Sequence, residues 1–415
     1  MAKVLFTNVN VLDCTGAAPF AGQVLIEGNR IRAVARAPGA VTSNGARVVD
    51  GRGATLMPGL VESHAHLTFT DIRQGTDLGR TPPEEHTLQT AGFARVLLDH
   101  GFTSCVSAAS AKPRLDVAVR RAIDAGDLPG PRLLTASPEM TVTSGLGDAR
   151  LWHMHQESFA VVCDGADDFR QYARLMCREG VDTLKINPSG DTLLPRARSK
   201  QTVMSEEEVK AVCDVAHAHE RRVAAHARSA ESVKLCLRHG VQIIYHANLA
   251  DEEARDLLEQ HRQEVFVAPT IGWTVGMLEH GAEFGRIRDA SERTTLEEEL
   301  RLTVENMRDL KRRGVRVLPG GDYGFAWNPN GTNARDIEHF VNLLDFSPME
   351  AILAATKSGG EMMMKGSELG QLTPGSLADL LLVDGDPLAD VGILQDQAKL
   401  IAIMKDGVFH KGGDW

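Results

Sequence analysis

The amino-acid sequence predicts an α/β fold, namely a (β/α)8, TIM-like barrel with a small composite β-sandwich domain formed by both chain ends. The middle of the 415-residue chain alternates apolar, strand-like runs with helical stretches, which is typical of parallel βα units. Both chain ends alternate apolar and polar residues between Gly and Asn turns, as short strands do. Several side chains that can bind a metal follow the predicted strands, where such barrels hold their chemistry.

Residues 1–58 and 366–415 are expected to form the composite β-domain. Segments such as "KVLFTNVNVLD" near the start and "LIAIMKDGVFHKGG" near the end show period-two alternation. Since both ends share this character, one small β-domain with a large domain inserted between its halves is the natural organisation. Residues 59–365 then form the catalytic barrel.

Eight apolar runs predict the barrel strands. The first run ends in "VESHAH", and the others lie at residues 101–110, 131–140, 181–190, 221–229, 241–249, 264–273 and 315–324. Most are separated by helical stretches, one of which begins with Ser205 and Glu208 at the spacing of a capping box. A doubly wound sheet is the competing fold, but no G-x-G-x-x-G follows the first strand.

His64 and His66 end the first predicted strand, with Ala65 between them. Residues i and i+2 of a strand point to the same side, so both imidazoles aim at one place. Two converging neutral imidazoles make half of a metal site. The alternative is a pair of surface or hydrogen-bonded histidines, so the interpretation depends on further ligands elsewhere.

Four further side chains follow later barrel strands. Lys185 lies at the end of the fourth strand, in "LKIN", and His226 at the end of the fifth strand, in "VAAHA". His246 lies at the end of the sixth strand, in "IIYHAN", and Asp322 at the end of the eighth strand, in "VLPGGDYG". The carboxyl ends of barrel strands meet at one rim. Each residue alone could be structural, but six such side chains at one rim indicate a metal centre.

Composition and charge limit the partners. A net charge of −11 argues against nucleic acid or an anionic membrane as the main partner. The six cysteines are scattered, as is typical of reduced thiols, and the start lacks a signal-peptide core. No run of 18 apolar residues is present. We therefore expect a cytoplasmic protein with a small-molecule substrate.

The motifs together resemble the amidohydrolase superfamily. The matching segments are "PGLVESHAH", "LKIN", "AAHA", "IIYHAN", "GGD" and the tail "LGQLTPGSLADLLLVDGDPL". The chain is most similar to the imidazolonepropionase-related branch, which contains prolidase-like dipeptidases, ochratoxin-type amidases, and phenylurea and molinate hydrolases. The resemblance spans nearly the whole chain, and relatives are often homo-oligomers.

The resemblance implies a site for two divalent metal ions. His64, His66 and Asp322 would hold the first, and His226 and His246 the second. Lys185 would be carboxylated and bridge them, since a free lysine amine is protonated at neutral pH and is a poor ligand. Imidazole and carboxylate ligands favour zinc, although manganese or cobalt could substitute.

The expected reaction is hydrolysis of a C–N bond next to a carbonyl. Two cations lower the pKa of a bridging water, so that a metal-bridging hydroxide can attack at neutral pH. One metal stabilises the oxyanion. Asp322 is the expected catalytic base, which passes the proton to the leaving nitrogen.

The chain departs from its dipeptidase-like relatives after the third strand. Their "GGH" histidine is replaced by Leu146 in "TSGLGDARLWHMH", and His153 or His155 could take over its contact with the scissile carbonyl. Relatives often have "EHG" at the sixth-strand ligand, where this chain has Tyr245. At the fifth-strand ligand, relatives have "HAY" and this chain has "HAR", with Arg228 in place of the tyrosine. Arg228 could bind a substrate carboxylate or pair with a neighbouring acid.

Three of the four tryptophans follow barrel strands, namely Trp152, Trp273 and Trp327. At the mouth of the site they would suit a flat or apolar substrate, although ordinary loop packing would also explain them.

We therefore expect a hydrolase of non-peptide aryl or apolar amides, carbamates or ureas. The alternatives are an Xaa-Pro-type or other dipeptidase or N-acyl amino acid amidohydrolase, a deaminase, and a non-catalytic barrel. Deaminases of the superfamily usually lack the bridging lysine, and a complete ligand set argues against a scaffold.

Overall fold

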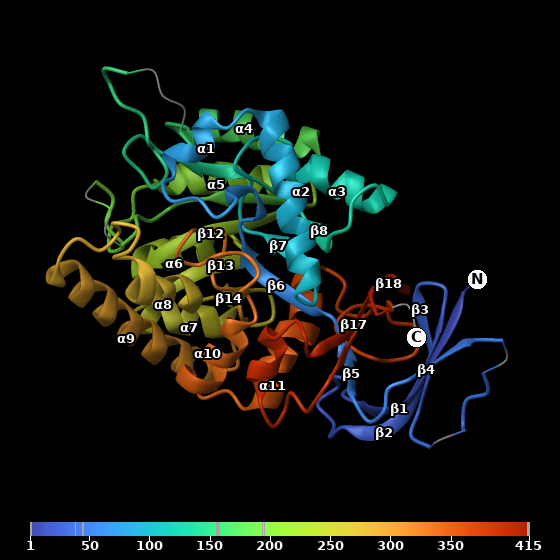
Figure 1. Ribbon diagram of the computed structural model, residues 1–415. Coiled ribbons are helices and arrows are strands. Elements are labelled where there is room, and N and C mark those ends of the chain that lie inside the picture. Colours follow the sequence, from blue (N-terminus) through green and yellow to red (C-terminus); the bar gives the residue numbers. More distant parts are fainter. Residues whose placement is uncertain are drawn as a thin grey trace.

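The computed structural model describes residues 2–37, 39–43, 45–154, 158–192, 194 and 196–412. It has the predicted fold class, because helices surround a barrel of parallel strands and a separate sheet combines strands from both chain ends (Figure 1).

The separate sheet joins the two ends of the chain by direct strand pairing. β5 and β16 pair antiparallel, with Met57 opposite Leu381. The strand order is β18-β17-β16-β5-β1-β2-β3, and β4 pairs with β1. Its strands are β1 (Lys3–Val11), β2 (Phe20–Glu27), β3 (Arg30–Ala35), β4 (Arg47–Asp50), β5 (Thr55–Pro58), β16 (Leu380–Val383), β17 (Leu400–Lys405) and β18 (Val408–Lys411).

The barrel strands are parallel and form two sheets, ordered β6-β7-β8 and β10-β9-β11-β12-β13-β14-β15. They comprise β6 (Leu60–Ala65), β7 (Phe102–Ser107), β8 (Arg132–Leu134), β9 (Ala136–Thr141), β10 (Val161–Val162), β11 (Thr183–Ile186), β12 (Arg222–Ser229), β13 (Ile243–Leu249), β14 (Phe266–Ala268) and β15 (Arg316–Val317). β8 and β9 are successive pieces of one run and link the two sheets.

The segment after β15 closes the barrel against β6. The backbone N–H of Asp322 donates to the carbonyl of His64 (3.0 Å), and that of His66 donates to the carbonyl of Tyr323 (2.8 Å). This closure brings the first and last strands side by side, although more than 250 positions separate them in the sequence.

Helices cover the outside of the barrel. The predicted capping box is present, since the Ser205 side chain accepts from the Glu208 N–H and the Glu208 side chain accepts from the Ser205 N–H. The helices are α1 (Thr76–Arg80), α2 (Pro83–Asp99), α3 (Leu115–Ala125), α4 (Ala166–Glu179), α5 (Glu206–Ala218), α6 (Ala230–Arg238), α7 (Glu252–Gln260), α8 (Ile271–His280), α9 (Ala290–Arg312), α10 (Arg335–Leu343), α11 (Pro348–Leu353) and α12 (Gly359–Met362). Short 3-10 turns η1 (Leu67–Phe69) and η3 (Val391–Gln395) and the π-helical segment η2 (Ala354–Ser358) complete the fold.

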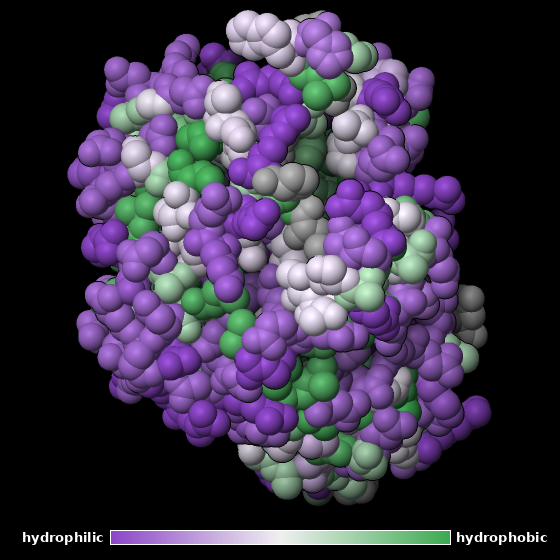
Figure 2. Space-filling model, turned by 90° about the vertical axis from the view of Figure 1, so that its left-hand side faces the viewer, coloured by the Kyte–Doolittle hydropathy of each residue, from purple (hydrophilic) through white to green (hydrophobic). Residues whose placement is uncertain are grey.

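Burial distinguishes the barrel strands from the surface. Every residue of β6, β7 and β11 is buried, as expected of a parallel sheet covered on both faces. Hydrophilic side chains cover most of the face shown in Figure 2, and hydrophobic ones appear there in separate patches. In the described part of the chain, no helix combines the length and apolarity needed to cross a membrane.

Candidate metal centre

The structure brings all six predicted ligands to one rim of the barrel. Each side chain is buried, yet each lines the same cavity of about 510 Å³. His64 lies in β6, His66 directly follows that strand, and Asp322 lies in the segment after β15. The six are His64, His66, Lys185 (β11), His226 (β12), His246 (β13) and Asp322.

Several ligand atoms converge closely. Oδ1 of Asp322 lies 3.1 Å from Nε2 of His66 and 3.5 Å from Nε2 of His64. One ligand atom from each of His64, His246 and Asp322 lies within 4.8 Å of the other two. The imidazole centroids of His226 and His246 are 4.1 Å apart. This spacing would allow two neighbouring cations to share the rim.

Three of the imidazoles are held in the neutral form that binds metals. Burial lowers the pKa of His64, His226 and His246 well below the ordinary value, and the nearby cations Arg228 and Lys185 act in the same direction. Nδ1 of His64 is buried without a hydrogen-bond partner among the described residues. Neutral imidazoles with a carboxylate in a buried cavity fit a zinc-type cation.

Asp322 is ionised in this environment. Burial alone would raise the pKa of its carboxyl, but His64, His66 and Lys185 outweigh that effect and lower the pKa below the usual range. The carboxylate is therefore available both as a ligand and as a proton acceptor.

Neighbouring groups orient the rings. Nδ1 of His246 lies 2.7 Å from the Thr270 hydroxyl, Nδ1 of His66 lies 3.3 Å from the Ala109 carbonyl, and Nε2 of His226 lies 3.0 Å from the Gly190 carbonyl. Such contacts fix the tautomer and direction of a ligating imidazole.

The backbone at the rim is locally strained. His246, Ala247 and Asp322 have φ values of 77°, 52° and 62°, a region that residues other than glycine rarely adopt. Strain of this kind is found where surrounding structure enforces a functional geometry.

Glu139 adds a seventh polar side chain that the sequence analysis missed. It lies in β9 and lines the cavity, with Oε1 at 3.5 Å from Nζ of Lys185. The amide of Asn187 donates to its Oε2 at 3.0 Å. The available signal was an acid near the carboxyl end of an otherwise apolar run, "PRLLTASPEM".

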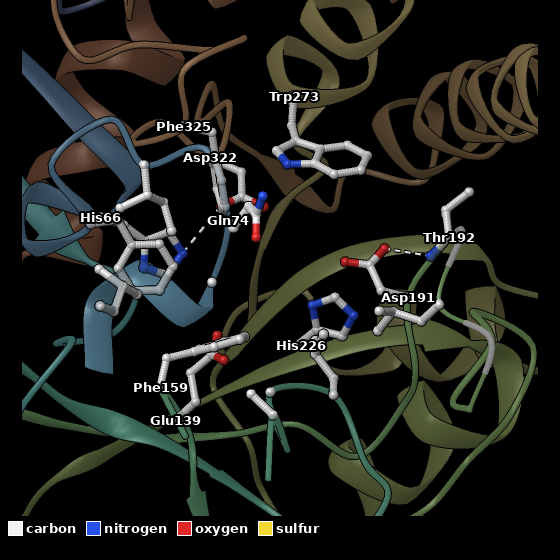
Figure 3. A pocket seen from close by; sticks show the side chains of 18 of the residues that line it. His66, Gln74, Glu139, Phe159, Asp191, Thr192, His226, Trp273, Asp322 and Phe325 are labelled. Carbon is white, nitrogen blue, oxygen red and sulfur yellow. Dashed lines mark hydrogen bonds and ion pairs between the residues drawn. The ribbon is translucent and has the colours of Figure 1, made fainter. Parts of the chain in front are cut away.

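Aromatic and aliphatic side chains form the walls of the cavity above the ligands. Trp273 and Trp327 line it as expected. In Figure 3, Trp273 faces Phe159 and Glu139 across the cavity, while His66, His226 and Asp322 point into it. The other aromatic and aliphatic lining residues are Phe69, Ile72, Leu78, Leu146, Ala149, Phe159, Leu194, Ala197 and Phe325.

Trp152 and His153 do not line this cavity. Leu151 and Met154 pair across a turn, and the two residues between them are exposed. The reason is local, because the pairing directs the middle of the turn to solvent. His155, the other candidate replacement for the missing histidine, lies outside the described residues.

Arg228 and Tyr245 also differ from the expected substrate contacts. Arg228 is fully buried, with Nε 2.9 Å from Oδ1 of Asp191 and a further ion pair to Glu299, so two acids already compensate its charge. Tyr245 is buried and stacks on His64 with ring centroids 3.8 Å apart. Neither residue lines the cavity.

Comparison with known proteins agrees with this architecture. Over 385 residues the chain is 24% identical to ochratoxinase of Aspergillus niger, covering 87% of this chain and 77% of the relative. It is 25% identical over 364 residues to imidazolonepropionase of Salinispora arenicola, with 81% and 80% covered. A solved prolidase bound to N-methylphosphonate-L-proline superimposes with a TM-score of 0.87 at 27% identity, covering 99% of this chain and 100% of that one.

The family model matches most of the chain. The Amidohydrolase family covers residues 55–409. This range includes every barrel strand, β5, β16 and β17 of the separate sheet, and the start of β18. The barrel, the converging rim ligands and these relatives lead to one conclusion. The chain belongs to the Amidohydrolase family.

Proposed function

We propose that this protein is a two-metal hydrolase that cleaves a C–N bond of a non-peptide amide, carbamate or urea with an aryl or apolar group. The convergence of His64, His246 and Asp322 within one buried cavity carries the proposal. Neutral imidazoles grouped with a carboxylate bind the divalent metal ions that catalyse hydrolysis.

His64, His66 and Asp322 would hold one divalent ion, and His226 and His246 the other. Lys185, carboxylated on Nζ, would bridge the two. Two bound cations would supply Lewis acidity for both water and the substrate carbonyl. Zinc fits this donor set best.

Asp322 is the proposed catalytic base. Its carboxylate stays ionised beside His66, so it can accept a proton from the attacking water. The same group then delivers this proton to the leaving nitrogen. The cavity walls hold the scissile bond near this carboxylate and exclude bulk water from it.

The wall residues support an apolar substrate. Trp273, Trp327, Phe325 and Phe159 surround the space above the ligands, and such surfaces favour flat or apolar groups. Leu146 lines the cavity at the position of the histidine found in dipeptidase-like relatives.

A second candidate is a dipeptidase or N-acyl amino acid amidohydrolase. The solved prolidase, 27% identical to this chain, favours it. A deaminase is a weaker candidate, because Lys185 lies at the rim among the ligands.

A product assay by mass spectrometry tests the proposal. Zinc-loaded protein would be incubated with N-aryl amides, carbamates and ureas, and separately with Xaa-Pro dipeptides and N-acyl amino acids. We expect cleavage of the aryl set, absent from protein treated with chelator. Cleavage of the peptide set alone would favour the second candidate, and release of ammonia alone would indicate a deaminase.

The protein is also proposed to act in the cytoplasm on a small molecule and to form a homo-oligomer. All six cysteines are buried and unpaired, which is compatible with a reducing compartment. Sedimentation velocity tests the oligomeric state.

A further inference from the structure

Arg286 is a partly buried arginine in the wall of the cavity. It lies between α8 and α9 and lines the cavity. Its guanidinium carbon sits 5.2 Å from the ring centroid of Trp327, and Trp327 in turn stacks on Phe325 with centroids 5.1 Å apart. The stack fixes the guanidinium at the wall, with one planar face on the indole.

No hydrogen bond or ion pair joins the Arg286 side chain to an acid in the described part of the chain, and its Nε is buried without a partner. Burial lowers the pKa of this guanidinium. A partly buried guanidinium without an ion pair is costly, and a bound anion recovers part of that cost.

Nearby arginines of the same region are already compensated. Arg288, two positions later, pairs with Glu292. Arg228 pairs with Asp191 and Glu299. Asp191 and, less strongly, Glu292 attract the charge of Arg286 without an ion pair to it. Asp191 is engaged by Arg228 at 2.9 Å and by the N–H of Thr192, and Glu292 by Arg288.

The outer part of the cavity therefore carries positive charge that no ion pair among the described residues compensates. Exposed Arg73 and Arg196 line it together with Arg286. Four acids line it, and each is engaged by another group. Asp148 pairs with Arg150 and Asp191 with Arg228, while at the inner end Glu139 faces Lys185 and Asp322 lies beside His66. The terminal nitrogens of a guanidinium form a planar fork that can bind a carboxylate by two parallel hydrogen bonds.

We propose that Arg286, seated on Trp327, is the specificity-determining residue that selects substrates carrying a carboxylate on the group remote from the scissile bond. This inference rests on the proposed function and deepens it. It assigns to Arg286 the contact that the sequence analysis suggested for Arg228. The substrate class is an aryl or apolar C–N compound with an anionic end.

Matched substrates test this inference. In the first pair, 4-acetamidobenzoate and 4-acetamidobenzamide, the carboxylate or carboxamide is on the amine side of the scissile bond. In the second pair, 4-(phenylcarbamoyl)benzoate and 4-(phenylcarbamoyl)benzamide, it is on the acyl side. For the zinc-loaded wild type we expect kcat/KM to favour the carboxylate about 10- to 100-fold in one pair. Arg286→Gln should bring that ratio near one, mainly by raising KM for the carboxylate member of the pair.

Arg288→Gln is the matched control, because it removes the same charge from the same loop but lies outside the cavity. It should keep the wild-type preference. Arg286→Lys should retain only part of it, since a lysine cannot form the two parallel bonds. A preference that is equally large in Arg286→Gln would overturn the inference.

A binding experiment separates this inference from the proposed function. Calorimetry would titrate 4-aminobenzoate and 4-aminobenzamide into zinc-loaded wild type, Arg286→Gln and Arg288→Gln. At least tenfold weaker binding of the carboxylate to Arg286→Gln alone would support the anion contact even if no substrate is cleaved. Equal carboxylate affinity in all three proteins would refute the contact, whereas absent turnover with intact binding would count only against the proposed reaction.

Discussion

The cavity has two unlike ends. The inner end consists of the six predicted ligands together with Glu139, and its groups come from the ends of barrel strands. The outer end consists of Phe159, Trp273, Phe325, Trp327 and Arg286, which lie on loops and on α8. Rigid strands position the polar groups, and the variable connections shape the space above them. The chemistry is therefore expected to depend on the inner end and the choice of substrate on the outer end.

The largest effect is expected from Asp322→Asn. An amide cannot accept the proton, so kcat should fall about 100- to 10,000-fold. Metal content, measured by plasma mass spectrometry, should stay close to the wild-type value. Asp345→Asn, an exposed change outside the cavity, should leave both unchanged. A wild-type rate in Asp322→Asn would remove this residue from the mechanism.

Lys185→Ala should reduce bound metal from two equivalents to one or fewer, because the proposed bridge is lost. Intact-mass measurement of the native wild type should also show the gain of one carbon dioxide. Lys234→Ala provides the control, since that lysine pairs with three acids away from the cavity. Two full equivalents of metal in Lys185→Ala would contradict the bridging role.

Glu139→Gln is expected to act at the inner end through Lys185 and Asn187. Loss of this negative charge from the inner end, together with the change in its contact with Asn187, should weaken metal affinity about tenfold. Competition with a fluorescent zinc chelator measures this change. Unaltered affinity would assign Glu139 to substrate contact instead.

Phe159→Ala should affect only the outer end. The removed ring borders the cavity and packs edge-on against Phe69, with centroids 6.2 Å apart. KM for aryl substrates should rise about two- to tenfold, with kcat and metal content unchanged. A small aliphatic amide serves as the control substrate. A fall in metal content would contradict the assignment of metal binding to the inner end alone.

The smallest effect on activity is expected from Asp336→Asn behind the rim. Its carboxyl accepts from the N–H of Gly320 and from the Tyr323 hydroxyl, and burial raises the pKa to about 7. The folded state therefore binds this proton more tightly than the unfolded chain does. Stability should fall as pH rises through the interval from about 4 to about 7, by about 1.4 kcal/mol per pH unit.

Urea titrations of metal-free protein at several pH values test this sign. In Asp336→Asn, the part of the pH dependence of the free energy of unfolding that Asp336 causes should be absent. Burial also raises the pKa of Glu62, from 4.5 to about 8. Glu62 should therefore preserve a decline of similar steepness in the variant over that interval. An identical slope in wild type and variant would exclude Asp336 as the titrating group.

The sequence by itself determined the barrel, the contribution of both ends to one sheet, and the candidate ligands. Strand periodicity places His64 and His66 on one side, and parallel strands end at a common rim. These features follow from local patterns that repeat along the chain, so they can be recognised without the fold.

Only the tertiary structure decided which polar groups have partners. Arg228 meets Asp191 and Glu299 from distant segments, whereas Arg286 meets none among the described residues. Trp152 faces solvent while Trp273 lines the cavity. Loop direction and long-range charge pairing depend on how distant segments pack, and no local sequence pattern encodes that packing.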